Sequence, residues 1–262
     1  MTARPRQIDL NSDLGEAYGP WKMGEDAEML GIVTSANIAC GGHAGDPETM
    51  FATLQEARTR RVSIGAHPGY ADRAGFGRRV IPMAVPEIER MVAAQVGALM
   101  GVAALAGVAV AYVKPHGALA NLAARDRAVA DAIARAVAAV SRDLAVLAIS
   151  GTALEPAAAA CGLAVFSEIF ADRAYQPNGQ LVPRGLPGAM IADAAVAAAR
   201  LVGFLASGLM PVLDGPPIRL AAHSICVHGD SAGAVAMARQ VRAALERAGV
   251  SIAPFQAVRS QR

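Results

Sequence analysis

Four of the five histidines, His43, His67, His116 and His228, lie at or just beyond the end of a short apolar segment. Histidine exchanges protons near neutral pH and is the commonest metal ligand, so these positions suit catalysis. A single buried histidine is usually a hydrogen-bonded core residue, but that explanation would have to apply four times. We therefore expect these four side chains to share one site. His223 lies at the start of its apolar segment, on the opposite face, and is expected to be structural.

Three polar residues, Asp9, Asn11 and Asp13, alternate along the first apolar segment. Side chains two residues apart on a strand point to the same face. Three polar groups directed into one protein interior are costly unless they bind something. We expect these residues to contact a substrate or an ion. Mutual hydrogen bonding with neighbouring strands is the alternative.

Lys114 is informative because the chain contains two lysines against twenty-two arginines. It stands directly before Pro115 and His116, at the end of another apolar segment. A lysine in this place favours a compact ammonium that holds an anion or polarises a carbonyl. Chance placement is the alternative.

Charged residues also follow two later apolar segments. Glu168 lies near the end of one of them, and Asp172 and Arg173 follow that segment. Arginine suits bidentate capture of a carboxylate or phosphate, although Asp172 could simply pair with this arginine. Asp230 follows His228 and is a candidate for binding substrate or for capping a helix.

Seven short apolar segments must position these residues, and alanine-rich segments with helical spacing separate most of them. The apolar segments are QIDLNSD (7–13), SANIACG (35–41), VSIGAHP (62–68), VAVAYVKP (108–115), LAVLAIS (144–150), LAVFSEIF (163–170) and HSICVHGD (223–230). Apolar strands that alternate with helices predict a parallel sheet buried on both faces. Seven such units, with no glycine-rich dinucleotide motif, favour a closed or nearly closed barrel. The carboxyl ends of barrel strands converge on one face, and the candidate residues lie at these ends.

Local signals set several boundaries. Asp46 and Pro47 predict the start of a helix that runs to Arg60. Asp230 and Ser231 predict the start of another that runs through Ala248. The segment 171–188 is rich in proline and glycine and is expected to be a lid or binding loop.

We expect residues 1–262 to form a single barrel domain, because no linker, internal repeat or low-complexity tract interrupts the chain. The net charge of +2 is spread without blocks, which gives no electrostatic reason to expect nucleic acid or a membrane as a partner. Three cysteines without a CxxC pair favour a reducing compartment, so the chain is expected to be cytoplasmic.

One apolar stretch, 91–113, is long enough to span a bilayer. It is mostly alanine and glycine and is interrupted at Gly107, so we expect a buried helix over about 86–106, followed by a strand. Gly97 and Gly101, four residues apart, would allow close packing within one barrel or between chains, and the sequence leaves a homo-oligomer open.

Six motifs together resemble the LamB/YcsF family. They are IDLNSDLGE (8–16), SANIACGGHAGDPETM (35–50), IGAHPGYADRAGFGRR (64–79), VKPHGALAN (113–121), EIFADRAYQPNGQLVPR (168–184) and ICVHGD (225–230). They cover nearly the whole chain in order, and the combination is far more specific than any one motif.

The resemblance implies a distorted seven-stranded (β/α) TIM-like barrel, related in fold to the glycoside hydrolase and metal-dependent deacetylase barrels. It also implies ATP-dependent hydrolysis of 5-oxo-L-proline to L-glutamate, with two partner subunits, B and C. ATP would be a co-substrate. The chain contains no GxxxxGK[ST] motif, so a P-loop in this chain would not hold it.

Opening a lactam needs an activated water, stabilisation of the developing oxyanion and a proton for the leaving nitrogen. Our hypothesis is that Asp13, His43 and His67 activate the water, with a divalent metal as an open alternative to direct acid–base catalysis. Lys114 and His116 would stabilise the oxyanion or orient the substrate.

Anion and substrate binding is expected of a second set: Asp9, Asn11, Glu168, Asp172, Arg173, His228 and Asp230. Two other functions remain open from the residues alone. One is a metal-dependent deacetylase acting on a sugar or another amide, and the other is a scaffold subunit whose partners perform the chemistry.

Overall fold

Seven parallel strands close into a barrel in the computed structural model, which describes residues 7–229 and 233–256. The strands are Gln7–Leu14 (β1), Ser35–Ala39 (β2), Ser63–His67 (β3), Tyr112–Val113 (β4), Ala145–Ile149 (β5), Val165–Phe170 (β6) and Ser224–Cys226 (β9). Neighbours pair in this order, and β9 pairs with β1 to complete the ring. The predicted seven-stranded α/β barrel is confirmed.

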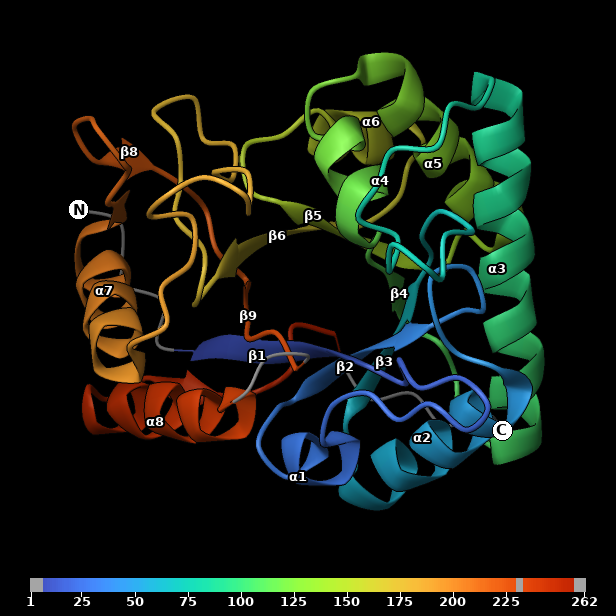
Figure 1. Ribbon diagram of the computed structural model, residues 1–262, viewed down its shortest axis with the longest axis horizontal. Coiled ribbons are helices and arrows are strands. Elements are labelled where there is room, and N and C mark those ends of the chain that lie inside the picture. The colour runs from blue at the N-terminus through green and yellow to red at the C-terminus, as the bar shows by residue number, and fades with distance from the viewer. Residues whose placement is uncertain (1–6, 230–232, 257–262) are drawn as a thin grey trace.

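Three further strands lie outside the ring. Ser251–Ile252 (β10) pairs in parallel with the start of β1. Leu209–Met210 (β7) and Ile218–Arg219 (β8) form a short antiparallel pair. Figure 1 shows β8 at one edge of the molecule, away from the strands of the barrel.

Helices surround the barrel (Figure 1). They are Asp26–Leu30 (α1), Pro47–Arg60 (α2), Val85–Ala106 (α3), Gly117–Ala123 (α4), Arg127–Val140 (α5), Leu154–Ala160 (α6), Ala194–Ser207 (α7) and Ala234–Arg247 (α8). Each barrel strand from β1 to β6 is followed along the chain by at least one of them. The chain therefore returns repeatedly to the same end of the barrel, which places the carboxyl ends of the strands together.

The predicted boundaries of α2 and α3 are confirmed to within one residue. Asp46 caps α2 by accepting a hydrogen bond from the backbone N–H of Thr49, and Pro47 occupies the first turn. α3 ends at Gly107, whose φ of +71° ends the helix in the left-handed region. The predicted start of α8 falls at residues 230–232, outside the described residues, and the described helix begins at Ala234.

α3 is long and apolar enough by length and composition to cross a membrane. It packs against α2 and α5, and its buried side chains include Val92, Val96 and Leu99. Its other face carries small residues, among them Gly97 and Gly101, whose Cα atoms have open space beside them. The helix has the one-sided burial of a helix on the outside of a barrel.

Tyr112 from β4 fills the barrel interior at the end opposite the carboxyl ends of the strands, which we call the lower end. The ring fits because residue 65 on the neighbouring β3 is glycine, since a Cβ there would overlap the Tyr112 ring. The Tyr112 hydroxyl donates a hydrogen bond to Asn37 Oδ1 at 2.7 Å. Phe255 packs against Tyr112 from below, with ring centroids 4.8 Å apart.

The regular part of β4 is shorter than the predicted strand over 108–115. The N–H groups of Ala111 and Lys114 still donate to β3 carbonyls, at 2.7 and 2.9 Å. Pro115 has no N–H and cannot extend the ladder. The segment still brings Lys114 to the expected end of the barrel.

Gly65→Ala is expected to destabilise the fold, because the new methyl group and the Tyr112 ring cannot occupy the same space. Overpacking of this kind costs about 1–3 kcal/mol in the free energy of unfolding, measurable by urea denaturation. Gly97→Ala is the matched control. It adds the same methyl group to an open helix surface and should stabilise by up to about 1 kcal/mol. Equal unfolding midpoints for the two variants would contradict the packing argument.

Candidate active site at the carboxyl ends of the barrel strands

Lys114 lies at the centre of the upper barrel and is 4% exposed. Its ammonium nitrogen lies 2.9 Å from Asp13 Oδ1 on β1 and 2.9 Å from Glu168 Oε1 on β6. It also lies 3.1 Å from Asn11 Oδ1 and 3.2 Å from Cys226 Sγ. Burial alone would lower the pKa of Lys114, but Asp13 and Glu168 hold that pKa well above its usual range. The ammonium is therefore a fixed positive charge.

Asp9 and Asn11 lie below this charge, where they bond to neighbouring strands. Asp9 accepts hydrogen bonds from the hydroxyls of Thr34, Ser35 and Ser224, and burial raises its pKa to about 6. Asn11 donates to Glu168 Oε1 at 2.9 Å. This is the mutual bonding that the alternation on β1 left open. Among the described residues, neither Asp9 nor Asn11 lines the cavity at the carboxyl ends of the strands.

Backbone carbonyls fix which nitrogen carries the proton in two of the histidines. His67 Nδ1 lies 2.7 Å from the carbonyl oxygen of Lys114, and His116 Nε2 lies 2.8 Å from that of Phe76. A carbonyl oxygen can only accept, so each of these nitrogens carries a hydrogen. The remaining nitrogens, His67 Nε2 and His116 Nδ1, lie 3.0 Å apart. When both rings are neutral, two lone pairs face each other.

Two carboxylates approach the same point. Asp13 Oδ2 lies 3.3 Å from His67 Nε2, and Glu16 Oε1 lies 3.7 Å from His116 Nδ1. Glu16 Oε1 also lies 3.2 Å from His43 Nε2. Burial lowers the pKa values of His43 and His116 well below the usual range, so these two rings are neutral. Lone pairs and carboxylates converge here, and a proton or a cation must separate them.

The convergence makes a buried cluster that could hold a metal ion. Glu16, His43, His67 and His116 each offer one ligand atom, and these atoms lie within 4.8 Å of one another. His43 stacks on His116 with ring centroids 3.6 Å apart, and its Nδ1 is buried without a hydrogen-bond partner among the described residues. Of the expected set of Asp13, His43 and His67, the two histidines thus join Glu16 and His116 in this cluster, and Asp13 lies beside it, 3.3 Å from His67 Nε2.

Glu16 is the member of this cluster that sequence analysis missed. Nothing distinguished it from a residue at the start of a helix. The signal lies in Gly15, whose φ of +67° turns the chain after β1 and directs the next residue back over the barrel. Gly69 and Gly77 are a second missed signal. A Cβ at Gly69 would lie 2.8 Å from His43 Nδ1, and one at Gly77 would lie 2.7 Å from His43 Cβ.

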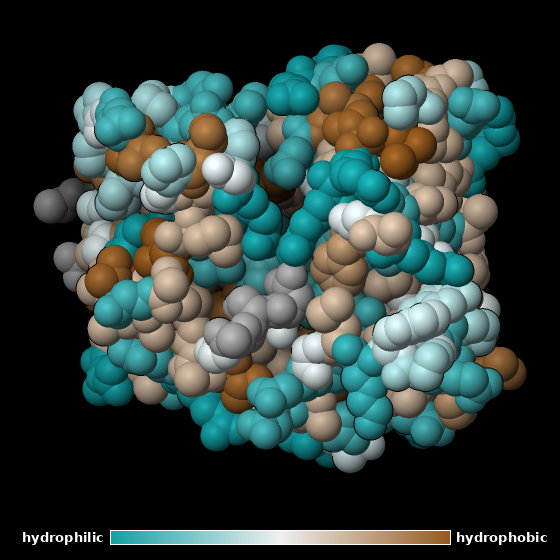
Figure 2. All heavy atoms as spheres, viewed as in Figure 1, coloured by the Kyte–Doolittle hydropathy of each residue, from teal (hydrophilic) through white to brown (hydrophobic). Residues whose placement is uncertain are grey.

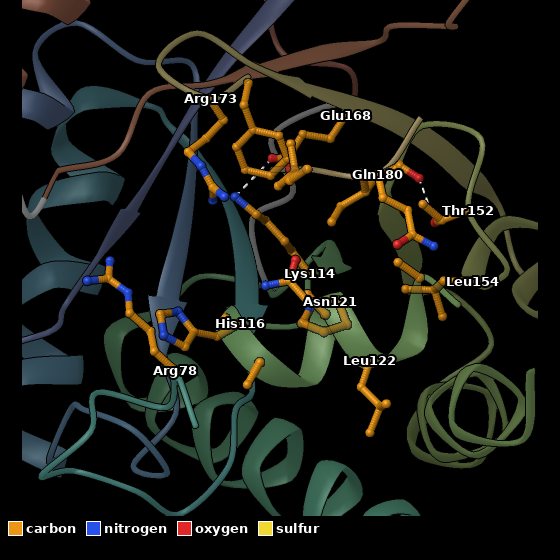
Figure 3. Close-up of a pocket in the computed structure, with 18 of the residues that line it drawn as sticks. Arg78, Lys114, His116, Asn121, Leu122, Thr152, Leu154, Glu168, Arg173 and Gln180 are labelled. Atoms are coloured by element: carbon orange, nitrogen blue, oxygen red, sulfur yellow. Dashed lines mark hydrogen bonds and ion pairs between the residues drawn. The ribbon is translucent and has the colours of Figure 1, made fainter. Parts of the chain in front are cut away.

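A cavity of about 450 Å³ opens above these residues. Its lining includes the polar residues Asp13, His67, Lys114, His116 and Glu168. Apolar side chains line another part of it: Leu122, Leu147, Ile149 and Leu154. Figure 3 shows Lys114, His116 and Glu168 around the same space as Leu122 and Leu154. The cleft is bordered by hydrophilic side chains on the face shown in Figure 2.

The loop expected to act as a lid lines the cavity with Arg173, Gln180 and Arg184. Arg173 is 4% exposed and donates to the carbonyl of Val182 at 2.6 Å. Among the described residues its Nε has no hydrogen-bond partner, and no carboxylate forms an ion pair with its guanidinium. Burial lowers its pKa to about 10, which leaves the guanidinium charged at neutral pH. A buried guanidinium that faces a cavity has the chemistry to receive a carboxylate or phosphate.

Asp172 pairs with His228, so the sequence alternative of an Asp172–Arg173 ion pair is not what the structure shows. His228 Nδ1 lies 2.8 and 2.9 Å from the two carboxylate oxygens of Asp172. His228 lines the cavity. Asp230, the remaining candidate, lies outside the described residues.

The comparisons with known proteins agree over nearly the full length of the chain. The model of the LamB/YcsF family matches residues 8–260. A protein of Paracidovorax citrulli, named as the A subunit of 5-oxoprolinase, is 53% identical over 95% of this chain and 99% of its own. The protein of the same name from Gluconobacter oxydans is 51% identical over 96% of this chain and 98% of its own.

One solved structure is similar throughout. The lactam utilization protein from Thermus thermophilus is 41% identical, with a TM-score of 0.89 over 95% of this chain and all of that one. A putative cellobiose-phosphate cleavage protein of Enterococcus faecalis, at 11% identity and a TM-score of 0.54, shares the fold alone.

Lys114→Met is expected to destabilise the protein by about 3–5 kcal/mol at pH 7, because Asp13 and Glu168 would be left buried without a cation. The deficit relative to wild type should shrink as the pH falls, since protonated carboxyls no longer need the ammonium. Lys22, the other lysine, is exposed, so Lys22→Met should change the free energy of unfolding by less than about 0.5 kcal/mol. Urea denaturation between pH 5 and pH 8 measures both. A deficit that does not depend on pH would contradict the charge argument.

Proposed function

Because the chain belongs to the LamB/YcsF family, we propose that it is the A subunit of an ATP-dependent 5-oxoprolinase, which opens the lactam ring of 5-oxo-L-proline to give L-glutamate. The observation that carries this proposal is the identity of about half the residues, over nearly full length, to proteins of that name. The family expected from the sequence motifs is thereby confirmed. The cavity supports the proposal with a buried cation, an apolar wall and a water-activating cluster in one place.

Substrate binding follows from the charges around the cavity. The substrate carries one carboxylate, and Arg173 offers a buried guanidinium with an unpaired Nε to receive it. The ring methylenes would pack against the apolar wall at Leu122 and Leu154. Lys114 keeps its charge throughout, so it would stabilise the oxyanion that forms on the lactam carbonyl.

We assign the activation of water to Asp13 and His67. Asp13 contacts both Lys114 and His67, and its Oδ2 lies 3.3 Å from His67 Nε2. A water held there would meet two acceptors for its proton. His116 and Glu16 complete the same group of acceptors.

The same residues fit a divalent metal. His67 and His116 hold their outward N–H groups on backbone carbonyls, which is the usual support for metal-binding histidines. With the carboxylate of Glu16 they form a ligand set that suits zinc. A metal in that position would lower the pKa of a bound water and polarise the lactam carbonyl.

ATP would be consumed by the assembly of this chain with partner subunits, B and C in the naming of the family. A five-membered lactam is an unstrained amide that re-forms readily, so coupling to ATP drives its opening. Dependence on ATP, together with three cysteines that form no disulfide, supports a cytoplasmic location.

Metal binding can be tested without any measurement of turnover. Chelator-stripped protein should bind one equivalent of Zn²⁺ by isothermal titration calorimetry. At 100 times the dissociation constant, the metal should stabilise the fold by about 2.7 kcal/mol. His67→Ala and Glu16→Gln should each abolish this effect, and Asp9→Asn, below the cavity, should retain it. Failure of wild type to bind Zn²⁺, Mn²⁺ or Mg²⁺ would mean that a proton lies between His67 and His116.

The proposed activity is tested by measuring glutamate formed from 5-oxo-L-proline, with and without ATP, by this chain alone and with subunits B and C. We expect ATP-dependent glutamate in the mixture. His43→Ala and His116→Ala should each lower the rate at least about 100-fold while leaving thermal unfolding little changed. Lys22→Met should retain the wild-type rate. No glutamate in any combination would overturn the substrate assignment, and ATP-independent release of acetate from an amide would favour a deacetylase.

A further inference from the structure

The histidines that line the cavity differ in the partner of their outward nitrogen. His67 and His116 each donate to a neutral backbone carbonyl. His228 Nδ1 instead faces both oxygens of the Asp172 carboxylate, at 2.8 and 2.9 Å. A carbonyl fixes the tautomer of an imidazole, whereas a carboxylate also stabilises its protonated form. The partner of His228 is thus a charged group, whereas the partners of His67 and His116 are neutral.

Asp172 is a charged partner although it is only 4% exposed. Burial alone would raise the pKa of this carboxyl, but His228 and Arg184 together hold it below its usual value. An ionised carboxylate has no hydrogen to donate, so Nδ1 of His228 carries the proton between the two groups. Nε2 is the nitrogen that remains for a ligand, and it has no hydrogen-bond partner among the described residues.

The dyad is held firmly from both sides. The backbone carbonyl of Asp172 accepts from Ile191 N–H at 2.8 Å, and Val227 N–H, one residue before His228, donates to the backbone carbonyl of Asn11 at 2.9 Å. The Phe170 ring lies against the imidazole, with centroids 5.5 Å apart and planes 20° from parallel. The His228 ring therefore has a defined orientation at the cavity wall.

His228 and His67 both lie close to Asp13. A ring nitrogen of His228 lies within 4.8 Å of an Asp13 oxygen. His67 Nε2 lies 3.3 Å from Asp13 Oδ2. A lactam carbonyl held near Asp13 and Lys114 would therefore lie within reach of the proton acceptors and of His228.

Other proton donors near this position are unsuitable. Lys114 is tied to Asp13 and Glu168, and these charges hold its pKa too high for proton transfer near neutral pH. Burial raises the pKa of the Cys226 thiol well above its usual range, and Cys226 is fully buried and not among the residues lining the cavity. His116 is neutral and its one hydrogen is committed to Phe76.

We propose that His228, oriented by Asp172, is the general acid that protonates the leaving nitrogen when the lactam ring opens. In this step the water oxygen bonds to the carbonyl carbon, and its proton passes to the acceptors around Asp13. The bond between the carbonyl carbon and the ring nitrogen breaks, and the nitrogen takes the proton from His228 Nε2. Solvent then returns a proton to His228. This assignment rests on the proposed lactam opening.

The test compares two substrates that differ at one atom. One is 5-oxo-L-proline, and the other is its lactone counterpart, 5-oxotetrahydrofuran-2-carboxylate, in which oxygen replaces the ring N–H. An alkoxide leaves far more readily than an amide anion, so ring opening of the lactone depends less on an acid. In the full assembly with ATP, His228→Gln should lower kcat/KM at least about 100-fold on the lactam and less than about tenfold on the lactone.

Asp172→Asn should show the same selective loss, because it removes the carboxylate charge that faces His228 Nδ1 and orients the ring. His116→Ala is the matched control, since it removes a group on the water side and should slow both substrates alike. In His228→Gly, added imidazole should restore opening of the lactam by entering the space beside Phe170, and it should fail to do so when Asp172→Asn is combined with this change.

Equal losses on lactam and lactone in His228→Gln, or no loss on the lactam, would overturn the assignment while wild type still forms glutamate. Absence of glutamate from wild type is a different result, which overturns the proposed function itself. Complete loss of activity in Cys226→Ala, with folding intact, would instead indicate a thiol nucleophile activated by His228.

Discussion

The ammonium of Lys114, buried between Asp13 and Glu168, is the interaction on which the rest of the site depends. Two carboxylates held so near each other inside a barrel would repel each other. They would also lose their hydration, at a cost of several kcal/mol for each ion. The ammonium offsets that cost only when β1, β4 and β6 are in correct register, since each strand contributes one of the three charges. A slip of one residue in β1 would turn Asp13 outward and break the arrangement. The three charges therefore help to fix the register of the strands.

Above this layer, the shape of the loops decides which histidine nitrogens face the cavity. His116 can stand against the Phe76 carbonyl because residues 69 and 77 are glycines, whose missing side chains leave room for the imidazoles. Any larger residue there would push His43 or His116 away from Glu16. The glycine-rich loop after β3 thus has the same effect as the ion triplet, since both keep buried polar groups close together.

Sequence reasoning reached the barrel because its strongest signals are local. The alternation of Asp9, Asn11 and Asp13 follows directly from strand geometry, and the cap of α2 follows from Asp46 and Pro47. The location of the site at the strand ends could be predicted from the sequence. The contacts between its side chains could be predicted less well. Glu16 contacts the histidines because the chain turns at Gly15. Asp172 pairs with His228, 56 residues away, and not with its neighbour Arg173. Such choices depend on the closure of the ring and cannot be found from spacing alone.

Our proposal for the reaction depends on the difference between a carbonyl and a carboxylate as the partner of a histidine. A cavity that held only bases or only acids could not both activate water and protonate a leaving nitrogen. Here neutral carbonyls face His67 and His116, and the carboxylate of Asp172 faces His228. In the proposed reaction this difference separates the proton acceptors around Asp13 from the donor at His228. Asp13 belongs both to the ion triplet and to the acceptors, so the register of the strands and the proposed chemistry depend on the same carboxylate.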